Sequence, residues 1–154
     1  MTLAKSINDQ LQNASPNQAV EVRAFDEKLR LEVKLADCGR LGCLLDSLNL
    51  EHIQDGQLAV NAVQVAERIT YLEERLDIIE SEGEKGRTLL RSTPPKVDGQ
   101  AVSFFEMVLD RSTRLSLVRY RYDANSGERT PVSAPLTRDT LERLIGDLLE
   151  LTDA

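Results

Sequence analysis

The sequence predicts an α+β fold in a single domain spanning residues 1–154. We expect an antiparallel sheet of five to seven strands packed against one long central helix, with a short helix at each end. Three observations lead to this expectation: a long helical stripe near the middle of the chain, alternating stretches on both sides of it, and shorter helical stripes at the two ends. A chain of 154 residues can bury one hydrophobic core without disulfides or metals.

The central helix is predicted over residues 58–82. Its apolar residues recur at spacings of four and three, which keeps one side of a helix apolar. They are Leu58, Ala62, Val65, Ile69, Leu72, Leu76 and Ile79. An Asp-Gly turn at residues 55–56 precedes the stripe, and glycines after residue 82 end it. In the alternative, residues 52–60 form a hairpin around this turn, and the helix begins near Asn61.

Both ends of the chain carry an amphipathic stripe. At the N-terminus, apolar residues at helical spacing run from Leu3 to Ala14 and stop before Pro16. At the C-terminus, Thr137 caps a predicted helix with Asp139 in its first turn. Its apolar stripe consists of Leu141, Leu144, Ile145, Leu148 and Leu149.

Three strands are predicted before the central helix. Residues 29–35 alternate apolar and charged side chains without a break, which is typical of a strand with one face on the core and one in water. Residues 20–25 also alternate, and a tight connection at residues 26–28 makes the two strands an antiparallel hairpin. Residues 41–50 are predicted as a third strand, with a helical turn from Asp46 as the alternative.

After the central helix, the predicted strands are residues 87–92, 102–109 and 114–122, with a short edge strand ending at Val132. The prolines at 94 and 95 end the first of these, and residues 96–100 are expected to be a loop. The triplets Gln18-Ala19-Val20 and Gln100-Ala101-Val102 open similar series of strands followed by a helix. They suggest a pseudo-repeat of two β-β-β-α units that share one sheet.

Composition limits the classes of partner and of compartment. The net charge is −7 and the isoelectric point is about 4.8, which argues against nucleic acid as the main partner because phosphate binding needs an excess of Lys and Arg. The first fifteen residues lack the continuous apolar run of a signal peptide, and no stretch is long enough to span a membrane. We therefore expect a cytoplasmic protein.

The sequence contains no recognised catalytic or cofactor motif, and we predict no enzyme activity, no cofactor and no metal. A Cys-x4-Cys pair, Cys38 and Cys43, cannot supply four zinc ligands with only His52 elsewhere, and a disulfide between them would close a short loop and stabilise little. Carboxylates on the predicted helix are expected to form its solvated face. The alternative is a cryptic small-molecule enzyme with a pocket around His52 or these carboxylates.

Two clusters are candidates for binding. Arginine beside tyrosine is the composition of protein-binding surfaces, so we predict a partner-binding cluster, with an ordinary outer sheet face as the alternative. It consists of Arg87, Arg91, Arg119, Tyr120, Arg121 and Tyr122. On the central helix, basic and acidic residues at heptad positions flanking the stripe predict a dimer edge with a parallel partner helix. These are Arg68, Glu73, Arg75 and Glu80. Packing of the helix on its own sheet is the expected arrangement, with dimerisation secondary.

The order of predicted elements resembles that of the class I type III secretion chaperones. This resemblance implies a dimer that wraps an extended segment of a partner protein. We therefore predict a non-catalytic protein–protein binding module, a small acidic homodimer with a chaperone-like or adaptor role. The alternatives are an anion or nucleic-acid binder that uses a basic sheet face, and the cryptic enzyme.

Overall fold

The computed structural model describes residues 2–53, 60–82, 86–110 and 113–152. Within them the chain forms ten strands and three helices. In chain order these are α1 (Leu3–Gln12), β1 (Val20–Phe25), β2 (Leu29–Cys38), β3 (Gly42–His52), α2 (Ala62–Arg68), β4 (Arg75–Ser81), β5 (Arg87–Thr93), β6 (Lys96–Asp98), β7 (Ala101–Asp110), β8 (Arg114–Asp123), β9 (Arg129–Val132), β10 (Ala134–Thr137) and α3 (Arg138–Thr152).

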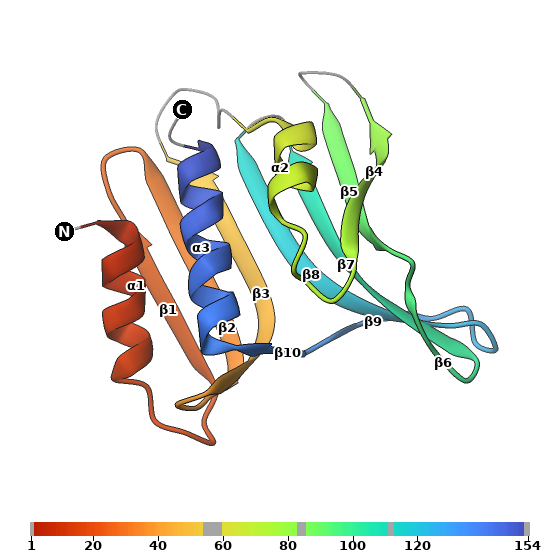
Figure 1. Ribbon diagram of the computed structural model, residues 1–154, viewed down its shortest axis with the longest axis horizontal. Coiled ribbons are helices and arrows are strands. Elements are labelled where there is room, and N and C mark those ends of the chain that lie inside the picture. The colour runs from red at the N-terminus through yellow and green to blue at the C-terminus, as the bar shows by residue number, and fades with distance from the viewer. Residues whose placement is uncertain (1, 54–59, 83–85, 111–112, 153–154) are drawn as a thin grey trace.

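All the strands belong to one antiparallel sheet in the order β1-β2-β3-β8-β7-β5-β4, with β10, β6 and β9 added to β3, β7 and β8. The three helices lie on one face of this sheet, with α1 and α3 over the β1–β3 half and α2 over the other half (Figure 1). We call the face that carries the helices the inner face and the opposite one the outer face. Among the described residues, no helix is long and apolar enough to cross a membrane.

The predicted long central helix is wrong. Helix α2 has only seven residues and is capped by Asn61, whose side chain accepts from the amides of Val63 and Gln64. The chain then reverses at Glu73, where φ is 55°, and continues as β4. The start near Asn61 agrees with the hairpin alternative, although residues 54–59 of that hairpin lie outside the described residues.

The heptad spacing led to the incorrect prediction of one long helix, because a short helix followed by a bend and a strand buries the same residues. Val65, Ile69, Leu72 and Leu76 are all fully buried, as a continuous helix would also have required. The β-branched and aromatic residues at 69–71 disfavour a helix there, and pairing with β5 satisfies the backbone of β4. Local spacing was therefore overridden by strand pairing.

Other parts of the predicted fold class also need correction. Ten strands replace the five to seven expected, and residues 96–98 form a strand where a loop was expected. The C-terminal helix is the longest in the described chain, with fifteen residues. The pseudo-repeat is wrong, because three strands precede α2 and seven follow it. The strands predicted at 20–25, 29–35 and 41–50 are confirmed as β1, β2 and β3.

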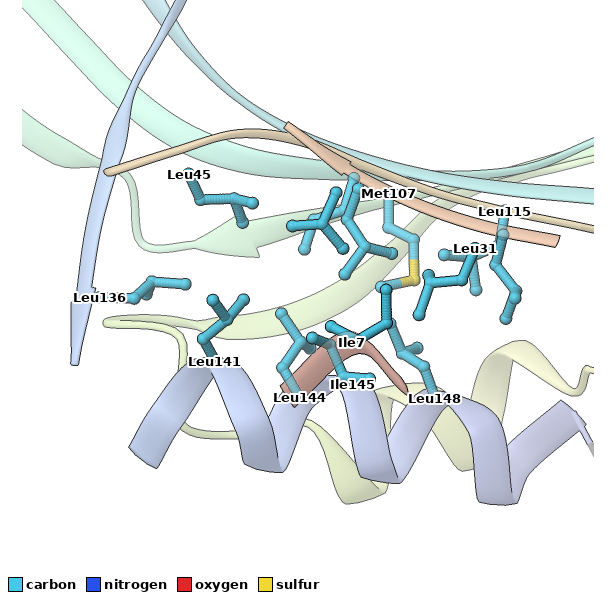
Figure 2. Close-up of a cluster of buried hydrophobic side chains, with 14 of the residues drawn as sticks. Ile7, Leu31, Leu45, Met107, Leu115, Leu136, Leu141, Leu144, Ile145 and Leu148 are labelled. Carbon is cyan, nitrogen blue, oxygen red and sulfur yellow. The ribbon is translucent and has the colours of Figure 1, made fainter. Parts of the chain in front are cut away.

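The hydrophobic core fills the space between the helices and the inner face. Figure 2 shows Leu141, Leu144, Ile145 and Leu148 of α3 pointing toward the sheet, together with Ile7 of α1. They meet a layer from the middle strands that includes Leu31, Leu45, Met107 and Leu115. This core supports the inner face only, so the outer face has no helix among the described residues to cover it.

Candidate functional site

The outer face of the sheet differs between its two halves. Over β1–β3 it carries charged side chains in opposite-sign pairs, such as Arg30 with Glu51 at 3.1 Å. Over β4–β9 the alternation of β7 and β8 places apolar and aromatic side chains outward. Register pairs Phe104 with Tyr120 and Val102 with Tyr122 across these two strands. A solvent-facing sheet face is normally polar, so the second half departs from the usual pattern.

Glu106 lies at the centre of this second half and is 7% exposed. Its Oε2 is 3.2 Å from Nη2 of Arg91, and its Oε1 is 2.7 Å from Nη2 of Arg129. Both guanidinium groups stack on rings: Arg91 is 4.7 Å from the centroid of Phe104, and Arg129 is 3.7 Å from that of Tyr120. The carboxylate thus holds two arginines flat on the aromatic residues.

A groove of about 520 Å³ runs beside this cluster. Its lining residues are Ile79, Arg91, Ser92, Thr93, Pro95, Val102, Phe104, Tyr122 and Arg129. We call it the outer-face groove. Tyr122 and Ile79 remain 41% and 43% exposed at its border, although both are large apolar side chains. The groove therefore combines an aromatic floor with an arginine rim, the combination that dominates binding energy at protein interfaces.

The structure divides the predicted partner-binding cluster. Arg91, Tyr120 and Tyr122 do come together on the outer face. Arg87 lies at the far end of β5, 3.7 Å from Asp110. Arg121 is exposed but lies on the opposite face by the alternation of β8. The convergence of arginines on one face that an anion or nucleic-acid binder needs is therefore not met.

Arg119 is the clearest correction within this cluster, because it is 5% exposed and faces the helices. Its Nη1 lies 3.3 Å from Oε1 of Glu74, and its Nη2 lies 3.3 Å from Oε2 of Glu73. Its guanidinium group also donates to Ser103 and stacks 4.7 Å from the centroid of Phe105. Arg119 ties the bend after α2 to β8 and is not available to a partner.

Sequence reasoning missed Phe104, Glu106 and Arg129. The alternation in residues 102–109 carried a signal, since its outward positions are Val102, Phe104 and Glu106 rather than uniformly polar residues. Arg129 gave no signal, because only the pairing of β9 with β8 brings it beside Tyr120. Residues 124–128 connect these strands, and spacing along the chain does not give the register in which they pair.

The predicted dimer edge is not a helix face. Arg68 ends α2 and pairs with Asp147 of α3 at 3.0 Å and with Glu150. Glu73 pairs with Arg119, and Arg75 lies 3.7 Å from Asp77 on β4. Glu80 is exposed on the same strand. A parallel coiled coil through these residues is excluded, because the helix stops at Arg68.

Residue Tyr71 joins the same α2–α3 contact. Its hydroxyl donates to Oδ2 of Asp147 at 2.6 Å, and the guanidinium group of Arg143 lies 4.0 Å from its ring centroid. Burial, followed by the hydrogen bond to Asp147, raises the pKa of Tyr71 above its ordinary value. This contact stabilises the fold rather than a dimer.

Strand β4 is an edge of the sheet, and its exposed side chains include two isoleucines as well as the charged Arg75 and Glu80. Val63, Ile78 and Ile79 are 53%, 41% and 43% exposed. A hollow of about 430 Å³ lies between α2 and β4, lined by Val63, Ala66, Glu67, Thr70, Arg75, Leu76, Asp77 and Ile78. We call this region the β4 edge. Edge strands present unpaired backbone groups that another chain can join.

The residues proposed for a cryptic enzyme are dispersed. The His52 amide donates to the Thr113 carbonyl at 2.8 Å at the end of β3. Glu73 and Glu74 are engaged by Arg119, and Asp77 lies beside Arg75. In the described part of the chain, no group of three or more His, Cys, Asp or Glu residues is arranged to hold a metal ion.

Comparison with protein-family models, curated proteins and solved structures found no match to this chain. The resemblance to type III secretion chaperones therefore stays a prediction.

Proposed function

We propose that the chain is a non-catalytic protein-binding module whose outer-face groove receives an extended segment of a partner protein. One observation carries this proposal: the outer face of the β4–β9 half has an aromatic groove of about 520 Å³ and no helix of the described chain on it. Such a surface is costly to leave in water, so a partner that covers it would be stabilised by burying apolar area.

The charges around the groove indicate the chemistry of the partner segment. Arg91 and Arg129 share one carboxylate, that of Glu106, which leaves the rim with one positive charge in excess. This is a local reversal in a chain whose net charge is −7. We expect a segment that combines a large apolar side chain, for the Phe104 and Tyr122 floor, with an acidic residue for the arginines.

The groove also limits the conformation of its partner. Its lining side chains stand on the neighbouring strands β4, β5, β7 and β8, and two of them, Val102 and Phe104, are alternate residues of β7. A floor of this kind suits alternate side chains of an extended peptide. A chaperone-like or adaptor role is one use of such a surface, and it stays a prediction.

The test selects peptides from a random display library with the full-length protein. Selected peptides should be rich in aromatic or aliphatic residues with Asp or Glu nearby, and should perturb the amide resonances of β5, β7, β8 and β9. Replacing Tyr122 by Ala should weaken their binding about tenfold, as at a typical interface anchor.

The matched control is Phe25→Ala, since Phe25 is an aromatic residue that is 75% exposed on β1, outside the groove. This variant should bind the selected peptides as the wild type does. Equal affinity of the wild type and Tyr122→Ala, or loss of binding in Phe25→Ala, would contradict the assignment of the groove.

We also propose that the acidic homodimer forms through the β4 edge, by antiparallel pairing of β4 with β4 of a second copy. The support is the exposed apolar side chains that flank the edge on its two sides, Val63 and Ile78 beside α2 and Ile79 on the outer face, next to unpaired backbone groups. A two-fold contact places identical side chains of the two copies against each other, so both copies gain from burying them.

Light scattering of the wild type and of Ile78→Lys tests the dimer. We expect the wild type to have twice the monomer mass and Ile78→Lys to be monomeric. Val97→Lys is the control, because Val97 is 70% exposed on β6, away from this edge. A monomeric wild type at high concentration would rule the dimer out.

A further inference from the structure

The two cysteines of the chain face each other across the hairpin that joins β2 and β3. Cys38 and Cys43 are direct cross-strand partners, and their Sγ atoms are 3.3 Å apart. Both are free thiols and only 2% and 4% exposed. The Gly39 amide donates to the Gly42 carbonyl at 2.9 Å, so the adjacent Cys38–Cys43 pair stands at a non-hydrogen-bonded position. Pairs at such positions are separated by about 4.5 Å between Cα atoms, a spacing that a disulfide spans.

A cation lies beside one of the two thiols. Arg138 opens α3, and its Nη1 is 4.0 Å from Sγ of Cys38 and 3.4 Å from the Gly39 carbonyl oxygen. The backbone amide of Arg138 donates to the Leu41 carbonyl at 3.0 Å, which holds the start of the helix against the hairpin. The guanidinium group therefore places a positive charge beside the sulfur of Cys38.

Each thiol also lines a hollow. One of about 540 Å³ lies beside Cys38 and is bordered by the exposed Arg40, with Arg138 and Glu142 on its rim. A second, of about 440 Å³, lies beside Cys43 and Pro135. Both cysteines belong to the buried hydrophobic core, and each borders one of these two hollows. A small disulfide-bearing molecule has space to approach Cys38 next to the arginine.

We propose that Cys38 and Cys43 form a redox-active pair that closes into a cross-strand disulfide by exchange with a low-molecular-weight disulfide. Cys38 is the attacking thiol, Cys43 is the resolving thiol and Arg138 is a positioning residue whose positive charge lies beside Cys38 Sγ. The division of roles is supported by Cys43, because burial and then its contact with Cys38 raise the pKa of Cys43 to about 12.

The exchange balances in two steps. Cys38 loses its proton to solvent, and its thiolate attacks a sulfur of the external disulfide; a mixed disulfide forms, and the first external thiolate leaves. Cys43 then gives up its proton and attacks Cys38 Sγ, which forms the internal disulfide and releases the second external thiolate. Both released thiolates take up the two protons. The protein pair is oxidised by two electrons, and the external disulfide is reduced to two thiols.

This goes beyond the sequence-based expectation, which gave the two cysteines no metal site and gave a disulfide between them little stabilising effect. A short loop does limit how much a disulfide stabilises the fold, but it does not limit its chemistry. What makes the exchange feasible is the register of β2 and β3 and the position of Arg138, neither of which spacing alone reveals.

The test equilibrates the full-length protein in buffers of defined reduced and oxidised glutathione ratio, followed by alkylation and intact-mass analysis. The sequence holds two cysteines, so an intramolecular disulfide is Cys38–Cys43 without further mapping. We expect a single transition from a doubly alkylated species to one that is two hydrogens lighter and unalkylated. Free thiols at every ratio, stable glutathione adducts or intermolecular dimers of the wild type would each overturn the proposal.

Four variants separate the roles. Cys43→Ser should stop at a glutathione adduct on Cys38, whereas Cys38→Ser should form an adduct far more slowly. Arg138→Gln should slow oxidation roughly tenfold, while Arg138→Lys, which keeps the charge, should restore much of the rate. The control is Arg143→Gln on the same helix, because Arg143 contacts Tyr71 instead. Equal rates for Arg138→Gln and the wild type would overturn the role of Arg138.

Discussion

Each half of the sheet's outer face holds a glutamate between two arginines, but the surroundings of the two glutamates differ. Glu51 on β3 lies 3.1 Å from Arg30 and 3.5 Å from Arg114, and its side chain is 30% exposed. Glu106 on β7 lies between Arg91 and Arg129, and its side chain is 8% exposed. The first pairing belongs to a solvated surface, whereas the second is enclosed by aromatic rings.

The two halves of the sheet also differ in the residues that they bury on the inner face. Under α1 and α3 the sheet presents fully apolar residues such as Val33, Leu48 and Leu50. Beside α2 it buries the charge of Arg119, held by Glu73 and Glu74. The β1–β3 half therefore resembles an ordinary amphipathic sheet, while the β4–β9 half keeps charges and aromatic residues where they cost stability. This contrast is why we place the binding function in the second half.

The largest expected effect comes from Arg119→Ala. Removing the guanidinium group leaves the nearly buried carboxylate of Glu74 without its cation, and we expect a loss of about 3–5 kcal/mol in the free energy of unfolding. Urea denaturation measures it. Arg121→Ala, on the same face but exposed, should change stability by less than about 0.5 kcal/mol. Similar losses in both variants would remove the distinction between the two arginines.

A smaller loss is expected for Glu106→Gln. The amide cannot pair with both Arg91 and Arg129, and the buried position raises the cost of weakened hydrogen bonds to about 1.5–3 kcal/mol. The variant should also weaken peptide binding, because the two arginines lose the group that holds them on the rings. Thermal unfolding and titration of the selected peptides measure the two effects. An unchanged melting temperature would contradict the importance of this carboxylate.

The Tyr71→Phe variant removes a hydrogen bond to a charged acceptor and should cost about 1 kcal/mol near neutral pH. The raised pKa of Tyr71 means that the folded state holds the phenolic proton more tightly than the unfolded state does. Its contribution is therefore fully present below the ordinary value of 10.0 and is lost as pH rises through the folded-state pKa. Denaturation from pH 8 to about pH 11 should show a steeper alkaline loss in the wild type than in the variant.

The smallest effect is expected for Glu51→Gln. This position repeats the geometry of Glu106 in solvent, where an ion pair contributes about 0–1 kcal/mol. Unfolding at low and high salt gives the measurement, with the already small difference shrinking as salt is added. If Glu51→Gln destabilised the protein as much as Glu106→Gln does, enclosure by aromatic residues would not be what separates the two halves.

The sequence predicted strands correctly in both halves of the sheet, including residues 87–92, 102–109 and 114–122 as β5, β7 and β8, but it did not predict the helix–strand unit between them and the first half. The alternation in residues 29–35 predicted β2 because each residue there has an apolar core on one side and water on the other. The stripe over residues 58–82 failed because a seven-residue helix followed by a strand buries the same leucines. Within the candidate site, Arg91, Tyr120 and Tyr122 were anticipated from composition. Arg119 was misplaced, since an arginine on a strand can extend into water or be held by acids that come from another element.

The sequence by itself determined the properties that depend on neighbours along the chain: the amphipathic strands of the first half, the two terminal helices and the acidic surface. Only the tertiary structure decided which segments pair, where the chain bends after α2, and which arginines meet Glu106 rather than Glu74. These depend on contacts between residues far apart in the chain, such as Arg129 with Glu106 and Cys38 with Arg138. Such contacts depend on the geometry of the whole sheet. The spacing of residues along the chain therefore does not predict them.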